Sequence, residues 1–347
     1  MKRIIISLMK DEKSGIVYAA PKLLLFIISF FYGCVIKIWS LAYDKGILKV
    51  YNAKTKVVSV GNITLGGTGK TPFSMFLAAY FKERNKKASV LIRGYGDDEW
   101  RMLENTLSDI PIITGRDRLR SAEKAVRNHR SEVLILDDGF QHRRLKRDLD
   151  IVLIDSSEGF GNSRLFPRGI LREPLEAIRR ADIIVMTKCD FGKVNLTELR
   201  ERISRYTENK NPVEAVYKPL MFIELFSKKS LRLDVVRGKN VCTVTAIANP
   251  SYFKYILKNL GANLVKNFDF PDHYNYSDSD IKRIQDEVKL FNCDYLAATE
   301  KDMVKLDKFR NADLTIPILI LYVELEITNG KEELFDRLDS VFSHKAS

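Results

Sequence analysis

Short apolar runs alternate with longer amphipathic stretches along much of the chain. Runs of about four apolar residues, each ending in a polar or glycine-rich turn, predict buried strands at 57–60, 89–92, 133–136, 151–154 and 183–186. Stretches of helical periodicity separate them, notably 72–82, 118–128 and 173–180. This alternation is typical of a parallel sheet with helices on both faces. Ligands bind such sheets at the carboxyl ends of the strands.

The alternation is interrupted around 195–235 by a charged helical stretch and two prolines, Pro212 and Pro219. It then restarts, with a strand, a helix and two further strands expected at 241–246, 251–260, 295–299 and 317–321. The pattern therefore predicts three parts. They are an N-terminal apolar helix (1–44), a larger α/β domain (45–212), and a smaller α/β domain (213–347) expected to close over the cleft.

The N-terminal part contains the longest apolar run. Residues 23–36 carry no charge, and Lys22 and Lys37 flank them. A full membrane span needs about 20 apolar residues, so this run is short unless the flanking lysines snorkel. The aromatic residues Tyr32 and Trp39 suit the headgroup level. The run predicts a membrane-seated helix, monotopic or barely spanning, and the alternative is a buried core helix.

Charge supports the membrane interpretation. The 347-residue chain has a net charge of +12, and residues 1–56 hold ten Lys and Arg against three Asp and Glu. Such a segment attracts nucleic acid or an anionic membrane, and the adjoining apolar run favours the membrane, with no nucleic acid as partner. The four cysteines form no CxxC pair, which argues against a disulfide framework or a zinc site and suits a reducing cytosol.

The strongest chemical signal follows the first strand, at 57–60. Gly66, Gly67 and Gly69 let backbone N–H groups close around a phosphate, Lys70 adds positive charge, and the Thr71 hydroxyl can ligate Mg²⁺. The strict GxxxxGKT pattern is broken at its first position, which is Thr64. The strand–loop–helix context nevertheless predicts a P-loop that binds ATP. Its expected nucleotide-binding residues are Thr64, Leu65, Gly66, Gly67, Thr68, Gly69, Lys70 and Thr71.

A second signal follows the strand at 133–136. Asp137 and Asp138 stand at its carboxyl end, where P-loop enzymes hold Mg²⁺ through an acidic residue. Doubled aspartates also occur as plain caps and turns, but the upstream P-loop favours the metal. We therefore expect Mg²⁺ to be held by Thr71 together with Asp137 or Asp138.

Candidates for a general base are less distinctive. Asp97 and Asp98 follow the strand at 89–92, and a carboxylate there can accept a proton from an attacking hydroxyl. By itself this cluster is more typical of a solvated acidic turn. Further along the chain, His273 lies in a compact polar segment, and Thr299 is placed to cap a helix.

Taken together, the motifs resemble those of the tetraacyldisaccharide 4′-kinase family, the lipid A 4′-kinases. The resembling segments occur in order along nearly the whole chain, at 59–72, 93–96, 137–150, 171–175, 270–274 and 299–306. The resemblance implies two α/β domains and transfer of the ATP γ-phosphate to the 4′-hydroxyl of a tetraacylated glucosamine disaccharide 1-phosphate. It implies Asp98 as the catalytic carboxylate, with Asp97 as its neighbouring alternative, and His273 as its support; Lys70 acts on the phosphates.

The resemblance also implies a location. The enzyme is expected at the cytoplasmic face of a Gram-negative-type inner membrane, as a peripheral or monotopic protein with no obligate protein partner. Two alternatives remain. Residues 187–190 read Thr-Lys-Cys-Asp, similar to the guanine-reading motif of G proteins, which would suit a GTPase-like hydrolase. The other is a nucleotide-switched membrane-binding protein.

Overall fold

The computed structural model describes residues 7–13, 15–94, 109–192, 194–207, 211–310 and 316–343. The chain divides into two compact units. Unit 1 combines the chain up to Arg93, the segment Asp109–Val216 and the segment from Ile327 onward, whereas unit 2 contains residues 217–326. We expected residues 213–347 to form one domain; instead, the segment from Ile327 returns to unit 1.

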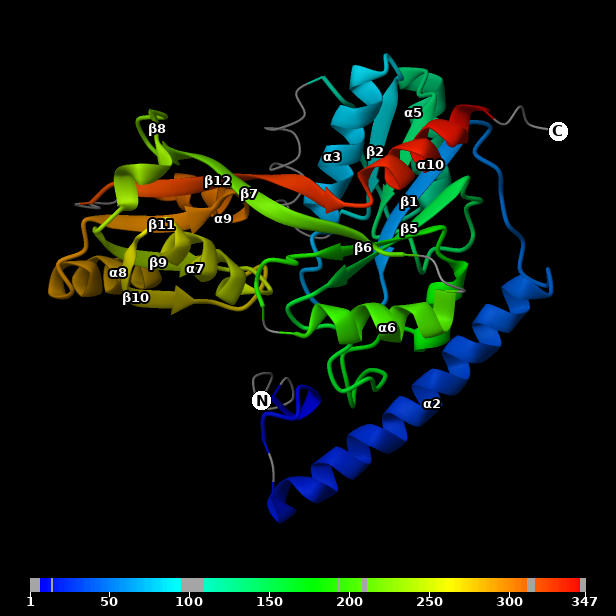
Figure 1. The fold of residues 1–347 in the computed structure, drawn as a ribbon, viewed down its shortest axis with the longest axis horizontal. Helices are drawn as coiled ribbons and strands as arrows, with labels where there is room; N and C mark the ends of the chain where they lie inside the picture. Colours follow the sequence, from blue (N-terminus) through cyan, green and yellow to red (C-terminus); the bar gives the residue numbers. More distant parts are fainter. Residues whose placement is uncertain are drawn as a thin grey trace. The chain divides into compact units, whose positions relative to one another are not determined.

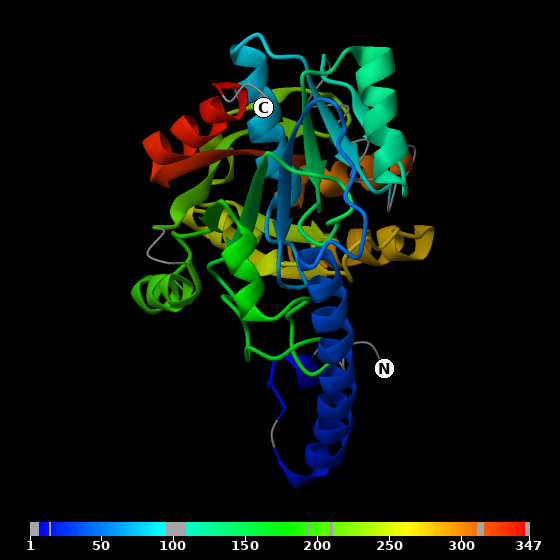
Figure 2. The ribbon, with the colours of Figure 1, turned by 90° about the vertical axis from the view of Figure 1, so that its right-hand side faces the viewer.

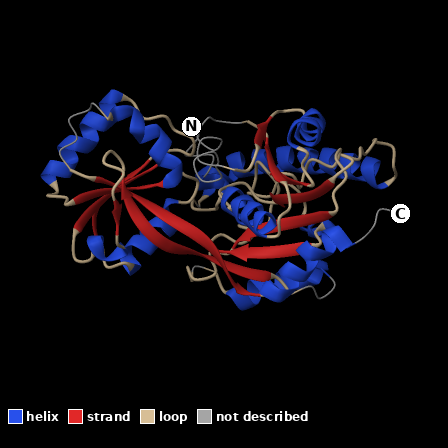
Figure 3. Ribbon diagram, turned by 90° about the horizontal axis from the view of Figure 1, so that it is seen from above, coloured by secondary structure: helices blue, strands red, loops and turns tan. Residues whose placement is uncertain are grey.

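Unit 1 is built on a parallel sheet. Its strands are β1 (Lys56–Asn62), β2 (Ala88–Ile92), β3 (Ile112–Thr114), β4 (Val133–Asp137), β5 (Leu149–Asp155) and β6 (Ile183–Thr187). Its helices are η1 (Ile16–Tyr18), α2 (Ala19–Asp44), α3 (Lys70–Glu83), α5 (Arg118–His129), η2 (Leu175–Arg180), α6 (Leu196–Thr207) and α10 (Lys331–Ser343). Figure 3 shows helices on both faces of the strands, as the alternation predicted.

The order of strands in unit 1 is β6-β5-β1-β4-β2-β3, all parallel. β2, β4, β5 and β6 are buried at every residue, which explains their continuous apolar sequences. β1 lies between β4 and β5, with Val60 in register with Asp137 and Ile151. The loop that follows β1 therefore starts beside the carboxyl end of β4.

Two long strands, β7 (Val213–Glu224) and β12 (Ile318–Asn329), run from one unit into the other. The segment after β12 belongs to unit 1 because α10 packs on α3. The Tyr80 hydroxyl donates to Asp339 at 2.8 Å, and the rings of Tyr80 and Phe335 are 4.8 Å apart. The sequence pattern had located only the first residues of β12, since its second half is partly exposed and less regular.

Unit 2 carries its own parallel strands in the order β10-β9-β11-β12. Its elements are β8 (Ser230–Leu231), η3 (Leu233–Val236), β9 (Asn240–Thr245), α7 (Pro250–Asn259), β10 (Asn263–Asp269), α8 (Asp278–Leu290), β11 (Tyr295–Thr299), α9 (Glu300–Leu306) and η4 (Asp307–Phe309). β10 was not predicted, because much of it is only half-buried and its sequence lacks a continuous apolar run.

Helix α2 differs from the other helices because apolar side chains cover its exposed surface. The segment Ile16–Asp44 has a mean hydropathy of 2.0 over its best window, only 6% of which is buried. Ser29 is the one described buried residue of α2. This exposure argues against the alternative of a buried core helix. By length and composition the helix can cross a membrane, and Figures 1 and 2 show it as the long blue helix of unit 1.

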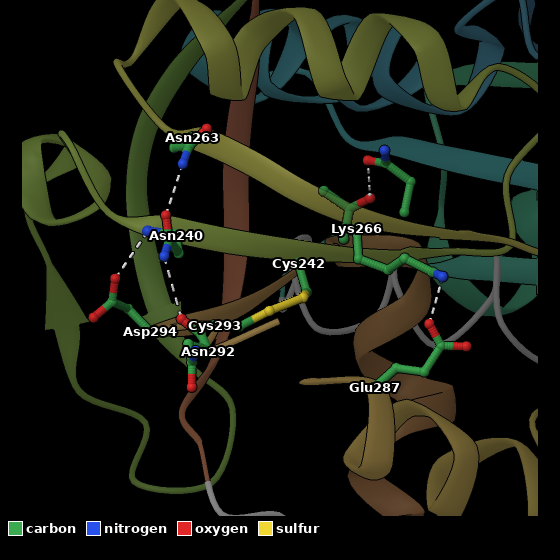
Figure 4. Close-up of a disulfide and its surroundings, with 10 residues drawn as sticks. Asn240, Cys242, Asn263, Lys266, Glu287, Asn292, Cys293 and Asp294 are labelled. Atoms are coloured by element: carbon green, nitrogen blue, oxygen red, sulfur yellow. Dashed lines mark hydrogen bonds and ion pairs between the residues drawn. A yellow bond between two sulfur atoms is a disulfide. The ribbon is translucent and has the colours of Figure 1, made fainter. Parts of the chain in front are cut away.

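Two cysteines of unit 2 form a disulfide. Cys242 on β9 and Cys293, just before β11, lie 6.1 Å apart between their Cα atoms (Figure 4). The sequence argued against a disulfide framework because the cysteines are far apart along the chain. The structure pairs these two because β9 and β11 are neighbours in the sheet. Cys34 and Cys189 remain thiols.

Candidate functional site

The glycine-rich loop connects the end of β1 directly to α3. Gly66 has φ 114° and Gly69 has φ 88°, a region that favours glycine. Gly69 is the N-cap of α3, so Lys70 and Thr71 occupy the first turn of that helix. Backbone N–H groups and the positive end of the helix dipole are therefore available to a phosphate here. This strand–loop–helix geometry is the one that the sequence predicted.

Thr64, the residue that departs from the strict motif, has a structural role. It is buried and forms an isolated antiparallel bridge with Leu171. Its carbonyl accepts the side-chain amide of Asn62 at 2.8 Å. The next residue, Leu65, donates its N–H to the Ile170 carbonyl at 2.7 Å. The start of the loop is thus attached to a second segment, which the sequence did not place near it.

The predicted cation and metal-binding groups come together in unit 1. The Thr71 hydroxyl donates to Asp137 Oδ2 at 3.3 Å, and Lys70 Nζ lies 3.6 Å from Asp138 Oδ1. Because β4 is next to β1, its carboxyl end brings both aspartates to the P-loop. Asp137 faces the hydroxyl that is expected to bind Mg²⁺, whereas Asp138 faces the lysine.

Arg172 is a site residue that the sequence analysis did not single out. Its guanidinium donates to both carboxylate oxygens of Asp138, at 2.7 and 3.2 Å, and to Asn62 Oδ1 at 3.0 Å. Burial raises the pKa of Asp138, but the charges of Lys70 and Arg172 outweigh it and lower the pKa to about 2. Asp138 is therefore ionised at neutral pH. The only sequence signal for Arg172 was its place in the family-like segment 171–175.

A second arginine supports the same strand end. Arg118, at the start of α5, is 3% exposed and donates to the Asp137 carbonyl at 2.7 Å. Burial lowers its pKa to about 10, so it remains charged. The same surroundings affect His142, whose pKa is lowered to about 4 by burial and by the nearby arginines. His142 is therefore neutral at physiological pH.

The carbonyl side of the P-loop is held by the end of β6. Lys188 Nζ donates to the Gly67 carbonyl at 2.9 Å, and the Thr187 hydroxyl donates to the Thr68 carbonyl at 3.0 Å. Lys188 also forms a buried ion pair with Asp155 at the end of β5. These contacts come from residues 187–190, the segment that resembles a guanine-reading motif. Two of these residues bind the phosphate loop itself.

His273 lies in unit 2, in a turn with φ 60°. Its Nε2 is 3.3 Å from Lys301 Nζ, and the same ammonium lies 3.0 Å from Asp272 Oδ1. Lys301 follows Thr299, which caps α9 by accepting the N–H of Asp302 at 3.3 Å, as predicted. The structure therefore adds Lys301 as a close neighbour of His273. Asp97 and Asp98, the candidates for the base, lie outside the described residues.

The arrangement in unit 1 fits Mg²⁺ bound together with a nucleotide. Among the described residues, no three His, Cys, Asp or Glu side chains are grouped to hold a metal by themselves. Mg²⁺ commonly uses one or two carboxylates and completes its shell with water and substrate phosphates. Thr71, Asp137 and Asp138 supply a hydroxyl and two carboxylates beside a phosphate loop, which matches that requirement.

Comparison with known proteins identifies the family. The model of the tetraacyldisaccharide-1-P 4′-kinase family matches residues 21–343. The chain belongs to this family. The tetraacyldisaccharide 4′-kinase of Halothermothrix orenii is 34% identical, with 91% of this chain and 92% of that protein covered. That of Syntrophus aciditrophicus is 33% identical, with 89% and 90% covered.

A solved structure agrees with the assignment. LpxK from Aquifex aeolicus, crystallised in complex with ATP, superposes with a TM-score of 0.72 at 27% identity over 92% of this chain and 99% of that chain. Membership of the tetraacyldisaccharide 4′-kinase family confirms the predicted fold and the predicted reaction. The reaction is ATP-dependent phosphorylation of a tetraacylated disaccharide 1-phosphate at its 4′ position. The GTPase and nucleotide-switch alternatives are not favoured.

Proposed function

We propose that unit 1 of this 4′-kinase binds the phosphates of MgATP through the P-loop and the carboxyl end of β4. The observation that carries this proposal is the contact of Thr71 with Asp137 and of Lys70 with Asp138. In this scheme Lys70 and the loop N–H groups bind the outer phosphates, and Thr71 and Asp137 hold Mg²⁺. The ion supplies positive charge to the phosphoryl group being transferred.

Asp138 and Arg172 have a separate part in the proposal. Asp138 remains ionised at neutral pH and holds both Lys70 and Arg172 close to the P-loop. The two cations thereby face the position where negative charge develops during phosphoryl transfer. Fixed charges of this kind stabilise a transition state without further reorganisation.

For the acceptor, we propose Asp98 as the general base that takes the proton of the 4′-hydroxyl, with Asp97 as the alternative. His273 is proposed to support the base. Lys301 Nζ lies 3.3 Å from His273 Nε2, and Asp272 Oδ2 lies 3.7 Å from the same nitrogen, so His273 has a charged neighbour of each sign. These roles follow from the family resemblance and from the neighbours of His273 in unit 2.

We further propose that the enzyme works as a peripheral or monotopic protein at the cytoplasmic face of the inner membrane, where its lipid-linked acceptor resides. The supporting observation is α2, which exposes large apolar side chains along its length and has basic residues near its start. These exposed residues include Leu23, Leu24, Phe26, Phe30, Phe31, Val35 and Ile38. An anionic membrane surface would attract the basic N-terminal segment.

The direct test is mass spectrometry of the lipid products formed from ATP and the tetraacylated disaccharide 1-phosphate. We expect one added phosphate at the 4′ position, and acceptor-independent GTP hydrolysis without lipid product would refute the assignment. Asp98→Ala should abolish turnover while ATP binding survives. Asp109→Ala, a surface carboxylate paired with Lys82, is the matched control. Loss of turnover in Asp97→Ala but not in Asp98→Ala would transfer the role to Asp97.

A further inference from the structure

The membrane-type helix α2 is bonded to the segment that carries Arg172. The Ser29 hydroxyl donates to the Leu165 carbonyl at 2.9 Å, and the Tyr32 hydroxyl donates to the Arg172 carbonyl at 2.7 Å. Ser29 is 6% exposed although its helix is otherwise largely exposed. In Figure 2, green segments of unit 1 lie beside the middle of the blue helix. One face of α2 is therefore part of unit 1.

Close packing accompanies these hydrogen bonds. Gly33 lies so near the segment that an added Cβ would come within 2.8 Å of Leu165 Cδ1. The rings of Tyr32 and Phe166 meet edge to face, with centroids 6.0 Å apart. Small residues at positions 29 and 33, one helical turn apart, allow the helix backbone to approach. The contact is specific in shape as well as in polar partners.

The segment that α2 holds is attached on its other side to the P-loop. Arg172 donates its N–H to the Ile63 carbonyl at 2.7 Å. This hydrogen bond is adjacent to the bridge between Thr64 and Leu171. The side chain of Arg172 binds Asp138. Tyr32 thus donates to the backbone of Arg172, the residue that joins the P-loop segment to Asp138.

The C-terminal end of α2 contacts the other site-bearing segment. Arg143 lies five residues after Asp138, and its guanidinium donates to the Ser40 carbonyl at 3.1 Å and to Asp44 Oδ1 at 2.6 Å. Helix α2 is therefore hydrogen-bonded to two segments. One is 165–172, which contacts the P-loop, and the other is the chain just after Asp138.

We propose that α2 is a positioning element of the active site as well as a membrane anchor, and that Tyr32 is its key residue. The Tyr32 hydroxyl fixes the backbone of Arg172, and through it the placement of the guanidinium on Asp138. This proposal rests on the proposed role of Arg172 beside the transferred phosphate. It makes catalysis dependent on how α2 is seated, even where no bilayer is present.

The test uses the full-length protein in detergent mixed micelles containing the acceptor, so that anchoring to a bilayer is not required. Tyr32→Phe keeps the ring and removes the hydroxyl. We expect kcat to fall about five- to tenfold, the effect of one lost hydrogen bond, with the KM for ATP changed less than twofold. Tyr43→Phe removes a hydroxyl from the same helix and serves as the control, with unchanged kcat.

A double-mutant cycle separates positioning through Arg172 from a general structural effect. In an Arg172→Ala background, Tyr32→Phe should lower kcat less than twofold further, because the residue it acts through is gone. An undiminished effect in that background would overturn the proposal, as would a Tyr32→Phe enzyme as active as the Tyr43→Phe control.

Hydrogen exchange supplies a readout that does not depend on turnover. The Arg172 and Leu65 N–H groups bond across the two segments, so peptides covering 163–173 and 63–66 should exchange faster in Tyr32→Phe than in the control. Unchanged exchange in both peptides would count against the proposal. If the wild type formed no phosphorylated lipid, the proposed function would fail, whereas the exchange result would still decide whether Tyr32 holds this segment.

Discussion

Replacing Lys188 by methionine tests how the P-loop is held. Methionine keeps most of the length of the side chain but removes the charge and the donor. The wild-type ammonium donates to the Gly67 carbonyl at 2.9 Å and pairs with Asp155, and both Lys188 and Asp155 are 6% exposed. The change therefore removes two interactions, one with the phosphate loop and one with a buried carboxylate.

The two lost interactions should affect different quantities. Loss of the ion pair should lower the free energy of unfolding, and loss of the hydrogen bond to Gly67 should weaken ATP binding. Breaking one partner of a buried ion pair costs about 3–5 kcal/mol, because a buried charge is left without its counter-charge. The Ser157 N–H and hydroxyl still donate to Asp155, which places the effect toward the lower end. A hydrogen bond from a charged donor contributes about 1.5–3 kcal/mol. Loss of that bond to Gly67 should weaken ATP binding by about tenfold or more.

Denaturant unfolding and calorimetric titration with ATP measure the two effects separately. In the double variant Lys188→Met with Asp155→Asn, the buried charge is gone while the amide oxygen can still accept from Ser157. We expect this variant to regain most of the stability but not the ATP affinity. Arg200→Met, which breaks the Arg200–Glu214 pair away from the loop, should leave ATP affinity unchanged.

Recovery of both stability and ATP affinity in the double variant would refute the reasoning, because Lys188 would then act only through folding. Unchanged ATP affinity in Lys188→Met would do the same. A loss confined to affinity, without loss of stability, would show instead that the buried pair contributes little.

Three further predictions concern other parts of the chain. The double variant Phe30→Ser with Phe31→Ser should no longer sediment with membranes, because both side chains are more than 60% exposed. Its turnover in micelles should persist. Continued sedimentation with membranes would contradict the membrane role of this face of α2. Burial raises the pKa of Glu300 from 4.5 to about 7, so the native state binds more protons than the unfolded state between those values and loses stability as pH rises through them. Glu300→Gln should therefore raise the unfolding free energy at pH 8 by about 3 kcal/mol relative to wild type and have little effect near pH 4.5, and equal gains at both values would argue against the shift. Asp138→Asn should lower kcat at least a hundredfold in a folded enzyme, as the proposed placement of Lys70 and Arg172 requires, and near-normal turnover would remove Asp138 from the site.

Much of the unit 1 sheet was predictable because its strands are buried on both faces. Such strands are short continuous apolar runs, and those expected at 57–60, 89–92, 133–136, 151–154 and 183–186 all lie within observed strands. The prediction of a helix at 173–180 was less accurate, because only Leu175–Arg180 is helical and it forms a 3-10 helix. Strands with exposed positions, such as β10 and the second half of β12, carry no such run and were missed.

Some residues of the candidate site were likewise predictable from the sequence, and others were not. Lys70, Thr71, Asp137 and Asp138 follow strands directly, so the rule that parallel strands present their carboxyl ends together was sufficient to find them. Arg172, Lys188 and Lys301 contact the site residues from segments that are remote in the chain. Arg172, Lys188 and Lys301 each fell within a motif or family-like segment, but no local pattern indicated which residue each would contact.

Features whose cause is local could therefore be predicted from the chain alone. The P-loop needs glycines at positive φ and a helix start, the parallel sheet needs apolar runs, and α2 needs a long uncharged segment, all within one stretch of chain. The contacts that these features make with remote segments depend on the three-dimensional fold. It placed Arg172 on Asp138, Lys188 on the Gly67 carbonyl, and Tyr32 on the Arg172 carbonyl. These contacts join residues from 34 to 140 positions apart, and they depend on strand order and helix docking, which no local pattern specifies.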